Sequence, residues 1–595
     1  MDDNPTGGLP VPIQDEIRAA AVDALIAWRA GKPVALPEPS DELLVRMLSV
    51  SMGEQVPPEY GPMIAWELGL RRASRDDGGI EVDPPDGFNV LVIGAGVSGI
   101  AAAVKLQAAG IPYTVVEKHE TVGGTWWENR YPGAGVDTPS ALYSFSFAEN
   151  DWSLYFALRD ELHDYLERVA TDFGVRPSIR FSTEVLEASY DEPAQGWTVR
   201  VRCGDGSIET LRASVVISAV GAFSRPKMPA IPGLDQFEGP CVHTARWPDG
   251  LEVGGRRVAV IGNGASAMQV LPAIAEEAAS VTAFQRSPQW AAPFDQFQTP
   301  VPEPVRFLAG EVPLYQKWYR VRSGWTFNDR IHPALQKDPS WPHPERAVNE
   351  INDRHRKFLT RYIESQIGDR PDLLEEVVPD YPPFGKRILL DNGWYRSLTR
   401  DDVRLVTEPI EEVRRDRVVT RSGAEHEVDV LVCATGFDVV RFLAPIEVRG
   451  RSGRSLRETW DDDDARAYLG TAVPDFPNFF MLYGPNTQAG HGGSLIGATE
   501  AQLHYIMDLL QRMFARGVGS VECRREVYDE YNQRVDEAHE RMVWTHPGMS
   551  TYYRNSRGRV VVNTPFRIVD FWHMTRTADL DDYVVEPAAE MAPAS

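Results

Sequence analysis

The chain has 595 residues, of which 43% are hydrophobic and 25% are charged, a composition typical of globular proteins with several domains. Its 86 acidic residues outnumber its 61 lysines and arginines, so the net charge is −25 and a nucleic-acid partner, which needs a cationic surface, is not expected. The four cysteines stand far apart without a CxxC pair, which argues against a disulfide scaffold, a zinc site and dithiol redox chemistry.

No segment of the sequence has the character of a membrane span or an export signal. The start is rich in acids and prolines, where a secretory signal would carry a basic and then an apolar stretch. The longest apolar stretch, residues 89–104, contains three glycines and is followed by Lys105, so it is not the run of about 20 apolar residues that crosses a bilayer. We therefore expect a cytoplasmic protein without a membrane partner.

Residues 1–87 are predicted to form a helical extension and a linker ahead of the main fold. Apolar residues recur at steps of three and four in residues 15–30 and 41–52, as on one face of a helix. Ser40 precedes an acidic first turn and is expected to cap the second of these helices. The stretch 71–87 is polar and rich in glycine and proline, which is typical of a linker.

The extension has an apolar face whose partner the sequence leaves open. One alternative is that the face joins two copies of the chain in a homodimer. The other is that it packs on the main fold of its own chain. Both alternatives fit helices that are apolar on one side. The residues of this face are Leu25, Ile26, Leu43, Leu44 and Met47.

A first dinucleotide-binding unit is predicted in residues 89–118. A buried-strand pattern leads into the turn Gly94-x-Gly96-x-x-Gly99, an alanine-rich helix and a second strand that ends at Glu117. Gly94 permits the tight turn, Gly96 lets a pyrophosphate approach the backbone, and Gly99 lets the helix pack on the strand. Glu117 can accept hydrogen bonds from a ribose diol.

A second unit repeats this order in residues 256–286, with the turn Gly262-x-Gly264-x-x-Ala267. Its second strand ends at Arg286, where the first unit has an acid. A guanidinium pairs with a 2′-phosphate, whereas an acid would repel it, so the second unit is predicted to prefer NADPH over NADH. The alternative is that Arg286 is a surface residue without a ligand.

The two units predict an α/β fold with two Rossmann-like domains, one for FAD and one for NADP, as in flavoprotein reductases and monooxygenases. The intervening residues 300–380 are rich in tryptophan and charge and are predicted to form a helical insertion in the NADP domain. The expected segments are 1–87 for the extension, 88–225 for the first part of the FAD domain, 226–428 for the NADP domain, 429–576 for the second part of the FAD domain, and 577–595 for a loose acidic tail.

Two longer patterns stand beside the glycine turns. Residues 237–248, FEGPCVHTARWP, resemble the FxGxxxHxxxWP fingerprint of Baeyer-Villiger monooxygenases, and residues 123–137 resemble the same family's GGxWxxxxYPGxxxD pattern. Both patterns match at every fixed position. Related flavin monooxygenases that oxidise nitrogen or sulfur share the first pattern but usually have Tyr or Phe where Trp247 and Pro248 stand.

The resemblance implies an NADPH-dependent FAD enzyme that inserts one atom of O2 next to a ketone carbonyl, through a C4a-peroxyflavin, and forms an ester or lactone. Arg387 matches the family position that presents a fixed cation to the anionic peroxide, and Asp137 matches the acid that orients this arginine. Lys386 matches the position that helps Arg286 to hold the 2′-phosphate. The role that the resemblance gives to His243 is conformational, because it couples domain rotation to the cycle.

Further cofactor contacts are also implied by the resemblance. Thr435 lies in a strand end, residues 434–438, that resembles the one passing close to flavin and nicotinamide. Tyr552 stands where many members of the family have the tryptophan of a Trp-Tyr pair. The residues expected to bind FAD or NADPH are Gly94, Gly96, Gly99, Glu117, Gly124, Thr125, Trp126, Asp137, Tyr143, Gly262, Gly264, Ser266, Arg286, Ser287, Lys386, Thr435 and Tyr552.

The substrate class follows from a narrower resemblance. The helical extension and residues 484–495 are more similar to the 4-hydroxyacetophenone monooxygenase branch than to the cyclohexanone branch, which implies aryl alkyl ketones as substrates. An N- or S-oxidising flavin monooxygenase is the nearest alternative, and a non-catalytic NADPH-binding assembly protein is a more distant one. A disulfide reductase with two dinucleotide sites would need a CxxC pair beside the flavin, and the chain has none.

Overall fold

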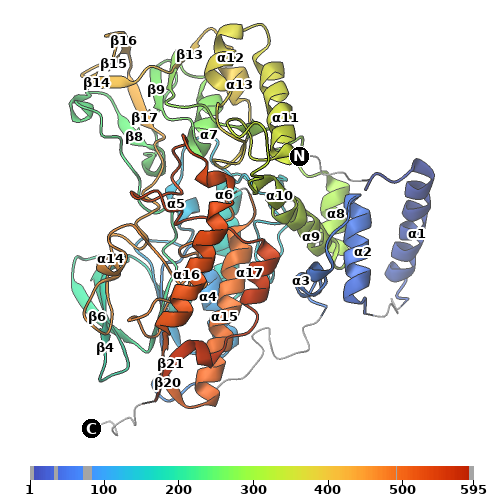
Figure 1. The fold of residues 1–595 in the computed structure, drawn as a ribbon, viewed down its shortest axis with the longest axis vertical. Helices are drawn as coiled ribbons and strands as arrows, with labels where there is room; N and C mark the ends of the chain where they lie inside the picture. The colour runs from blue at the N-terminus through green and yellow to red at the C-terminus, as the bar shows by residue number, and fades with distance from the viewer. Residues whose placement is uncertain (1–5, 33–37, 71–82, 491, 589–595) are drawn as a thin grey trace.

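Two five-stranded parallel β-sheets form the centre of the molecule (Figure 1). The computed structural model describes residues 6–32, 38–70, 83–490 and 492–588. The strand order is β19-β7-β1-β2-β3 in the first sheet and β13-β10-β9-β17-β8 in the second, and all neighbouring strands are parallel. This topology confirms the predicted α/β fold with two Rossmann-like units.

In each sheet the central strand is buried, leads into a glycine turn and continues as a helix. In the first sheet that helix is α4 (Val97–Ala108), and in the second it is α7 (Ala265–Ile274). The first sheet contains β1 (Val90–Ile93), β2 (Tyr113–Val116), β3 (Ile179–Arg180), β7 (Val215–Ser218) and β19 (Phe479–Met481). The second contains β8 (Cys241–His243), β9 (Arg257–Ile261), β10 (Ser280–Phe284), β13 (Val403–Val406) and β17 (Val430–Cys433).

The chain returns to the first sheet later than the sequence suggested. We expected the second part of the FAD domain to start at residue 429, but β17 pairs with β9 and β8 and lies in the second sheet. The apolar run Val430–Cys433 is buried in that sheet, where a parallel strand covered on both faces is stable. The first sheet regains a strand only at β19, which pairs with β7.

The segments before and after the helical insertion lie side by side, because β11 (Ala291–Ala292) pairs with β12 (Leu389–Leu390). Between these short strands the chain forms helices, as the sequence predicts for residues 300–380. Figure 1 shows α11 and α12 beside the second sheet, and α8 and α9 towards the extension. The helices are α8 (Glu303–Glu311), α9 (Tyr315–Phe327), α10 (His332–Leu335), α11 (Glu350–Ile367) and α12 (Pro371–Val377).

The extension forms α1 (Val11–Arg29), α2 (Asp41–Met52) and α3 (Gly61–Glu67). The Ser40 side chain accepts a hydrogen bond from the Leu43 backbone N–H, which confirms the predicted cap of α2. Leu44 is fully buried in a cluster that also contains Val321 of α9 and Val569 of α17. In α2, therefore, the residue of the apolar face that is buried packs on its own chain.

The rest of the apolar face remains exposed to solvent. Ile26, Leu43 and Met47 are exposed, and Leu25 is half-buried. No residue of α1 is buried, and in Figure 1 this helix stands apart at the outer side of α2. Part of the linker 71–87 lies outside the described residues.

The end of the chain is more ordered than expected. We predicted a loose tail from residue 577, but β21 (Tyr583–Pro587) pairs antiparallel with β20 (Val518–Cys523). Tyr583 is buried, and its hydroxyl lies 2.9 Å from that of Tyr505 in α15 (Leu495–Ala515). One buried aromatic side chain and a paired strand therefore fix the tail as far as residue 588, and the remaining residues of the tail lie outside the described part.

Smaller sheets and further helices cover the two central sheets. Among the described residues, no helix has both the length and the apolar character needed to cross a bilayer, and no cluster of side chains could hold a metal ion. The remaining elements include α5 (Thr125–Glu128), α6 (Arg159–Asp172), α13 (Trp394–Ser397), α14 (Leu456–Thr459), α16 (Arg525–Glu540), α17 (Ile568–Met574), β4 (Thr183–Asp191), β5 (Gly196–Cys203), β6 (Ile208–Ala213), β14 (Ile410–Arg414), β15 (Arg417–Thr420), β16 (Glu425–Glu427) and β18 (Glu447–Arg449).

Candidate active site

The first glycine turn is closed too tightly for side chains. Gly94 has φ +102°, and a Cβ on it would lie 2.9 Å from the carbonyl oxygen of Ala219, just after β7. A Cβ on Gly99 would overlap the carbonyl oxygen of Gly94. Gly96 caps α4 without any side-chain hydrogen bond, so the N–H groups of its first turn are left for an anion such as a pyrophosphate.

A second glycine segment lies against this turn. Gly124 has φ +53°, and a Cβ on it would lie 3.1 Å from the Cα of Gly96. The Gly123 N–H donates to the carbonyl oxygen of Ala95 at 3.1 Å, which joins the two backbones. Because neither segment has side chains at the contact, a phosphate group can approach the backbone, and these residues fit the pyrophosphate of a dinucleotide such as FAD.

Glu117 lies where the first unit was predicted to hold a ribose. It directly follows β2 and is buried. One of its carboxylate oxygens accepts from the Ala95 N–H at 2.7 Å and the other accepts from the His119 N–H at 2.8 Å. The backbone thus fixes the carboxylate next to the glycine turn, and each oxygen keeps a further lone pair for a ribose hydroxyl.

The second glycine turn meets the strand end at Ala434. Gly262 has φ +113°, and a Cβ on it would overlap the carbonyl oxygen of Ala434. Gly264 caps α7 without a side-chain hydrogen bond, so this helix also has free N–H groups for an anion. Asn263 closes the turn by donating to Gln285 Oε1 at 2.9 Å and to the carbonyl oxygen of Ser287 at 2.7 Å.

Two distant segments bring cations to the end of β10. Arg286 is exposed, and Lys386 Nζ donates to Ser287 Oγ at 2.8 Å. Burial and the nearby charge of Arg286 lower the pKa of Lys386 to about 8. Like charges held this close to each other favour a dianion between them, so the three residues fit the 2′-phosphate of NADPH.

Arg387 and Asp137 form a bidentate ion pair. Arg387 Nε donates to Asp137 Oδ2 and one Nη donates to Oδ1, both at 2.8 Å. Burial alone would raise the pKa of Asp137, but the guanidinium outweighs it and holds this pKa below its usual range. Burial opposes the charge of Arg387, yet the carboxylate raises its pKa further, so it stays cationic. The pair is half-buried, since 20% of the Arg387 side chain and 26% of the Asp137 side chain are exposed.

Tyrosines surround this ion pair. Tyr143 accepts a hydrogen bond from Trp126 Nε1 at 3.0 Å and is buried. Tyr552, which is 40% exposed, accepts from Gln488 Nε2 at 3.3 Å. Desolvation of the hydroxyl groups raises the pKa of both tyrosines, although part of Tyr552 is exposed, and the charge of Arg387 opposes that shift.

Tyr483 is a member of this group that the sequence did not suggest. Burial raises its pKa, while Arg387 opposes the shift and Tyr552 adds to it, which places it at the same centre. It stands two residues after the end of β19 and has φ +53°, which is unusual for a residue with a side chain. Because β19 was not predicted as a strand, its carboxyl end could not be assigned to the site.

The strand end after β17 is tied to the segment that leaves the first sheet. Thr435 Oγ1 donates to the carbonyl oxygen of Lys227 at 2.6 Å, so its hydroxyl is engaged within the protein. The Gly436 carbonyl oxygen accepts from the Lys227 N–H at 2.9 Å and lies 3.0 Å from His243 Nε2. His243 Nδ1 accepts from the Ala245 N–H, so Nε2 carries the proton and donates it. Burial lowers the pKa of this histidine.

The fingerprint segments also connect the two units. Tyr131 OH donates to Gln269 Oε1 of α7 at 2.7 Å, and Gln269 Nε2 donates to the carbonyl oxygen of Gly135 at 2.9 Å. The segment that carries Asp137 is therefore held by the helix of the second unit. Thr125 opens α5 beside Gly124, and Ser266 lies in the first turn of α7.

Comparison with known proteins gives concordant results. Residues 91–301 match the protein family described as Pyridine nucleotide-disulphide oxidoreductase. The chain is 51% identical to a protein of Sinorhizobium fredii named Uncharacterized monooxygenase y4iD, over 99% of this chain and 88% of the relative. It is 38% identical to a Baeyer-Villiger monooxygenase of Streptomyces coelicolor, over 84% of this chain and 93% of the relative. It also matches the crystal structure of cyclohexanone monooxygenase from Rhodococcus sp. Phi1 bound to NADP+, with a TM-score of 0.73 and 30% identity over 84% of this chain and 99% of that one.

Proposed function

Because the chain belongs to the Baeyer-Villiger monooxygenase family of flavin-dependent enzymes, we propose that it oxidises a ketone to an ester or lactone with FAD, NADPH and O2. The balanced reaction consumes ketone, O2, NADPH and a proton, and it yields ester, water and NADP+. The observation that carries this proposal is the half-buried, bidentate ion pair of Arg387 and Asp137, in a chain with two glycine turns that each fit a dinucleotide.

Arg387 is assigned to the stabilisation of negative charge. Bound FAD, once reduced by NADPH, supplies the chemistry that activates O2. Attack on a ketone carbonyl places negative charge on oxygen, and a guanidinium that stays protonated in a buried site stabilises such charge. Asp137 holds the guanidinium through two hydrogen bonds, so its role is to orient Arg387 rather than to exchange a proton.

The second glycine turn, with Arg286, Ser287 and Lys386, is assigned to NADPH. The 2′-phosphate of NADPH would bind between Arg286 and Lys386, because the charge of Arg286 and burial together lower the pKa of Lys386 despite the opposing charge of Asp380. The first turn, Glu117 and the Gly123–Gly124 segment are assigned to FAD.

The substrate class that we propose is an aryl alkyl ketone. The resemblance of the extension and of residues 484–495 to the 4-hydroxyacetophenone branch supports it. The aromatic side chains of Tyr143, Tyr483 and Tyr552 near Arg387 support it as well, because aromatic rings pack well against an aryl group.

The test is NADPH consumption in air by the FAD-loaded protein, with and without an aryl ketone such as 4-hydroxyacetophenone, and with mass analysis of the product. We expect ester formation coupled to NADPH loss. Arg387→Ala should lower the rate of ester formation by about 100- to 1000-fold, the usual effect of removing one preorganised electrostatic group. Arg361→Ala, which removes an exposed arginine of α11, is the matched control and should leave the rate unchanged.

The competing assignment is an N- or S-oxidising flavin monooxygenase. If amines or sulfides gain oxygen while a broad panel of ketones gives only hydrogen peroxide, the ketone assignment is wrong. Trp247 and Pro248, together with the Arg387–Asp137 pair, favour the ketone.

We also propose that α1 joins two copies of the chain. Its exposed residues include Ile17, Val22 and Ile26, and α1 buries no residue against its own chain. Light scattering after gel filtration should show a dimer for the full chain and a monomer for a chain that starts at residue 39, just before α2. An unchanged mass would remove this role from α1.

A further inference from the structure

One face of α11 is directed at the loop that precedes Lys386 and Arg387. Asn352, His355 and Arg356 occupy positions i, i+3 and i+4 of this helix, so their side chains lie on the same side. Leu359 and Ile363 continue the face and are buried.

Asn352 and His355 hold the middle of the loop. Asn352 is fully buried, and its Nδ2 donates to the carbonyl oxygen of Pro383 at 2.9 Å. The His355 ring packs edge to face on the ring of Phe384, with centroids 5.2 Å apart. Burial lowers the pKa of His355 to about 4, so this ring is uncharged at neutral pH.

Phe384 has a backbone conformation that needs such support. It is fully buried, and its φ of +65° lies in the left-handed region that residues with side chains avoid. It stands three residues before Arg387. A loop that carries this strain close to two functional cations keeps its path only if neighbouring groups hold it.

Arg356 holds the start of the same loop. Its guanidinium donates to the carbonyl oxygens of Pro379 at 3.0 Å and Tyr381 at 3.2 Å. It also lies over the ring of Trp290, 5.2 Å from the centroid. Among the described residues it forms no ion pair with a carboxylate.

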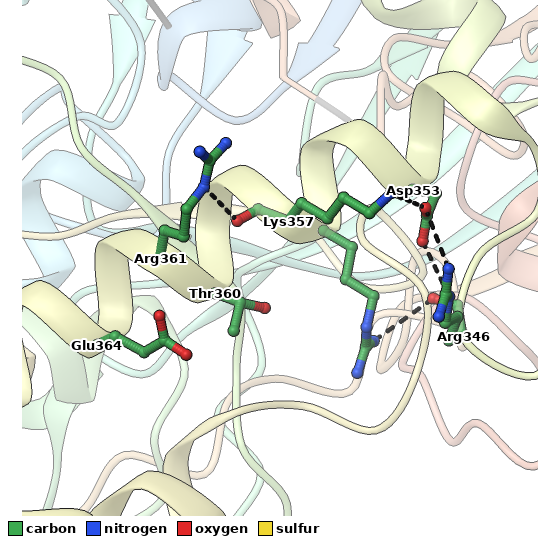
Figure 2. A pocket seen from close by; sticks show the side chains of 7 residues that line it. Arg346, Asp353, Lys357, Thr360, Arg361 and Glu364 are labelled. Carbon is green, nitrogen blue, oxygen red and sulfur yellow. Dashed lines mark hydrogen bonds and ion pairs between the residues drawn. The ribbon is translucent and has the colours of Figure 1, made fainter.

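Asp353, three residues before Arg356 on the same helix, is bound by other cations. Figure 2 shows Asp353 bound by Arg346 and Lys357 at the edge of a surface hollow of about 480 Å³ on the outer side of α11. Arg361 lines the same hollow, and its Nε donates to the carbonyl oxygen of Lys357. Arg356 also lines this hollow and donates to the carbonyl oxygen of Arg346 at 3.4 Å, but its two shorter hydrogen bonds go to the loop.

Tyr381 extends this support to the segment of Arg286 and Ser287. Its carbonyl oxygen accepts from Trp290 Nε1 at 3.0 Å, and its hydroxyl donates to the carbonyl oxygen of Pro288 at 2.9 Å. Lys386 Nζ lies over the Tyr381 ring, 4.6 Å from the centroid. One tyrosine thus touches both segments that bring cations to the expected phosphate site.

We propose that Asn352, His355 and Arg356 are positioning residues, which act through Tyr381 and Phe384 to set Lys386 for the 2′-phosphate of NADPH. The inference rests on the proposed NADPH dependence. It assigns a role to the helical insertion, because α11 then makes the second unit selective for the phosphorylated cofactor by supporting the loop of residues 379–387.

The test measures binding of 2′,5′-ADP and 5′-AMP to the FAD-loaded full chain by calorimetry. Arg356→Met keeps much of the aliphatic stem over Trp290 and removes the guanidinium. It should weaken 2′,5′-ADP binding about tenfold, the size expected when a charged hydrogen bond is misplaced, and change 5′-AMP binding less than about twofold. Arg354→Met makes the same change at an exposed arginine of α11 and should alter neither affinity.

Two further variants separate positioning from a loss of folding. Arg356→Lys restores the charge and part of the donor set, so it should recover part of the affinity for 2′,5′-ADP. Tyr381→Phe removes only the hydroxyl that reaches Pro288 and should act in the same direction as Arg356→Met, with a smaller change. Both variants should raise KM for NADPH more than KM for NADH.

Other outcomes would contradict either the role of Arg356 or the NADPH dependence itself. Equal losses for 2′,5′-ADP and 5′-AMP would show that Arg356 supports the unit as a whole and would overturn the inference, as would unchanged binding of both. If the unaltered protein binds 2′,5′-ADP no better than 5′-AMP, the NADPH dependence itself is wrong, and this result is seen before any variant is compared.

Discussion

The two glycine turns share a motif but complete their sites in different ways. In the first unit, Gly99 must lack a side chain, whereas the second unit carries Ala267 at the same position. The first unit ends at Glu117, which two backbone N–H groups fix within a few residues of the turn. The second unit obtains Lys386 from a loop about a hundred residues further along the chain. The motif therefore determines the backbone path, and we propose that the nucleotide preferred by each unit depends on the residues at the end of its second strand.

The largest change should follow from Gly99→Ala. The added methyl group would overlap the Gly94 carbonyl oxygen, so α4 must move away from the glycine turn that precedes it. We expect a loss of about 1–3 kcal/mol in unfolding free energy, as for other overpacked sites. We also expect a low ratio of flavin to protein absorbance after purification. A variant that retains full flavin would show that the first unit tolerates a methyl group at residue 99, as the second unit tolerates the one of Ala267.

Lys386→Met tests the completion of the second unit. Loss of a hydrogen bond from a charged group costs about 1.5–3 kcal/mol, so KM for NADPH should rise about 10- to 100-fold. KM for NADH should change little, because NADH lacks the 2′-phosphate. Lys357→Met, at an exposed lysine of α11, is the control for a simple change in net charge. An equal rise of KM for both cofactors would contradict the role of Lys386 in phosphate recognition.

The pH dependence of NADPH binding should reveal the titration of Lys386. The pKa of Lys386 is about 8 in the free protein, because burial and Arg286 disfavour its charged form, and a bound phosphate would raise it. Binding therefore requires proton uptake above pH 8, and affinity falls as pH rises. Between pH 7 and pH 9 the Kd of 2′,5′-ADP should increase about tenfold, since one pKa unit corresponds to a factor of ten. The Kd of 5′-AMP serves as the reference and should stay nearly constant.

Ala267→Gly should have the smallest effect. It makes the second turn resemble the first, but no close contact requires the absence of this Cβ. The cost is that of glycine in a helix, about 0.5–1 kcal/mol of unfolding free energy, which a denaturant titration can measure. KM for NADPH should be unchanged. A loss of NADPH binding would mean that the methyl group itself contributes to the site.

The parts of the site that are local in sequence could be predicted from it. Glu117 and the glycines of each turn lie within one strand-turn-helix unit, where spacing determines geometry. Asp137 and Arg387 are 250 residues apart, and only the resemblance to a family paired them. Tyr483 had no signal of its own, because a three-residue strand precedes it and the first sheet was not expected to end there.

The fold shows the same division between local and distant contacts. The first two helices of the extension, α1 and α2, follow from periodic apolar residues, and Ser40 caps α2 as expected. The partner of a single strand does not follow from periodicity. For this reason β17 was predicted to belong to the FAD domain although it pairs in the second sheet, and β21 was not predicted. Which faces of the extension are covered was decided by α9 and α17, whose residues lie hundreds of positions later.

The distribution of strands between the two sheets has a consequence for synthesis. The second sheet possesses all of its strands once residue 433 has left the ribosome, whereas the first sheet waits for β19 at residues 479–481. Domains commonly fold in the order in which they are made. Here the unit that begins later can be finished earlier, so β1, β2 and β7 must remain without their edge strand while the second unit closes. A nascent chain halted after residue 433 has left the ribosome, but before residues 479–481 are made, would therefore contain a complete second sheet and an incomplete first one.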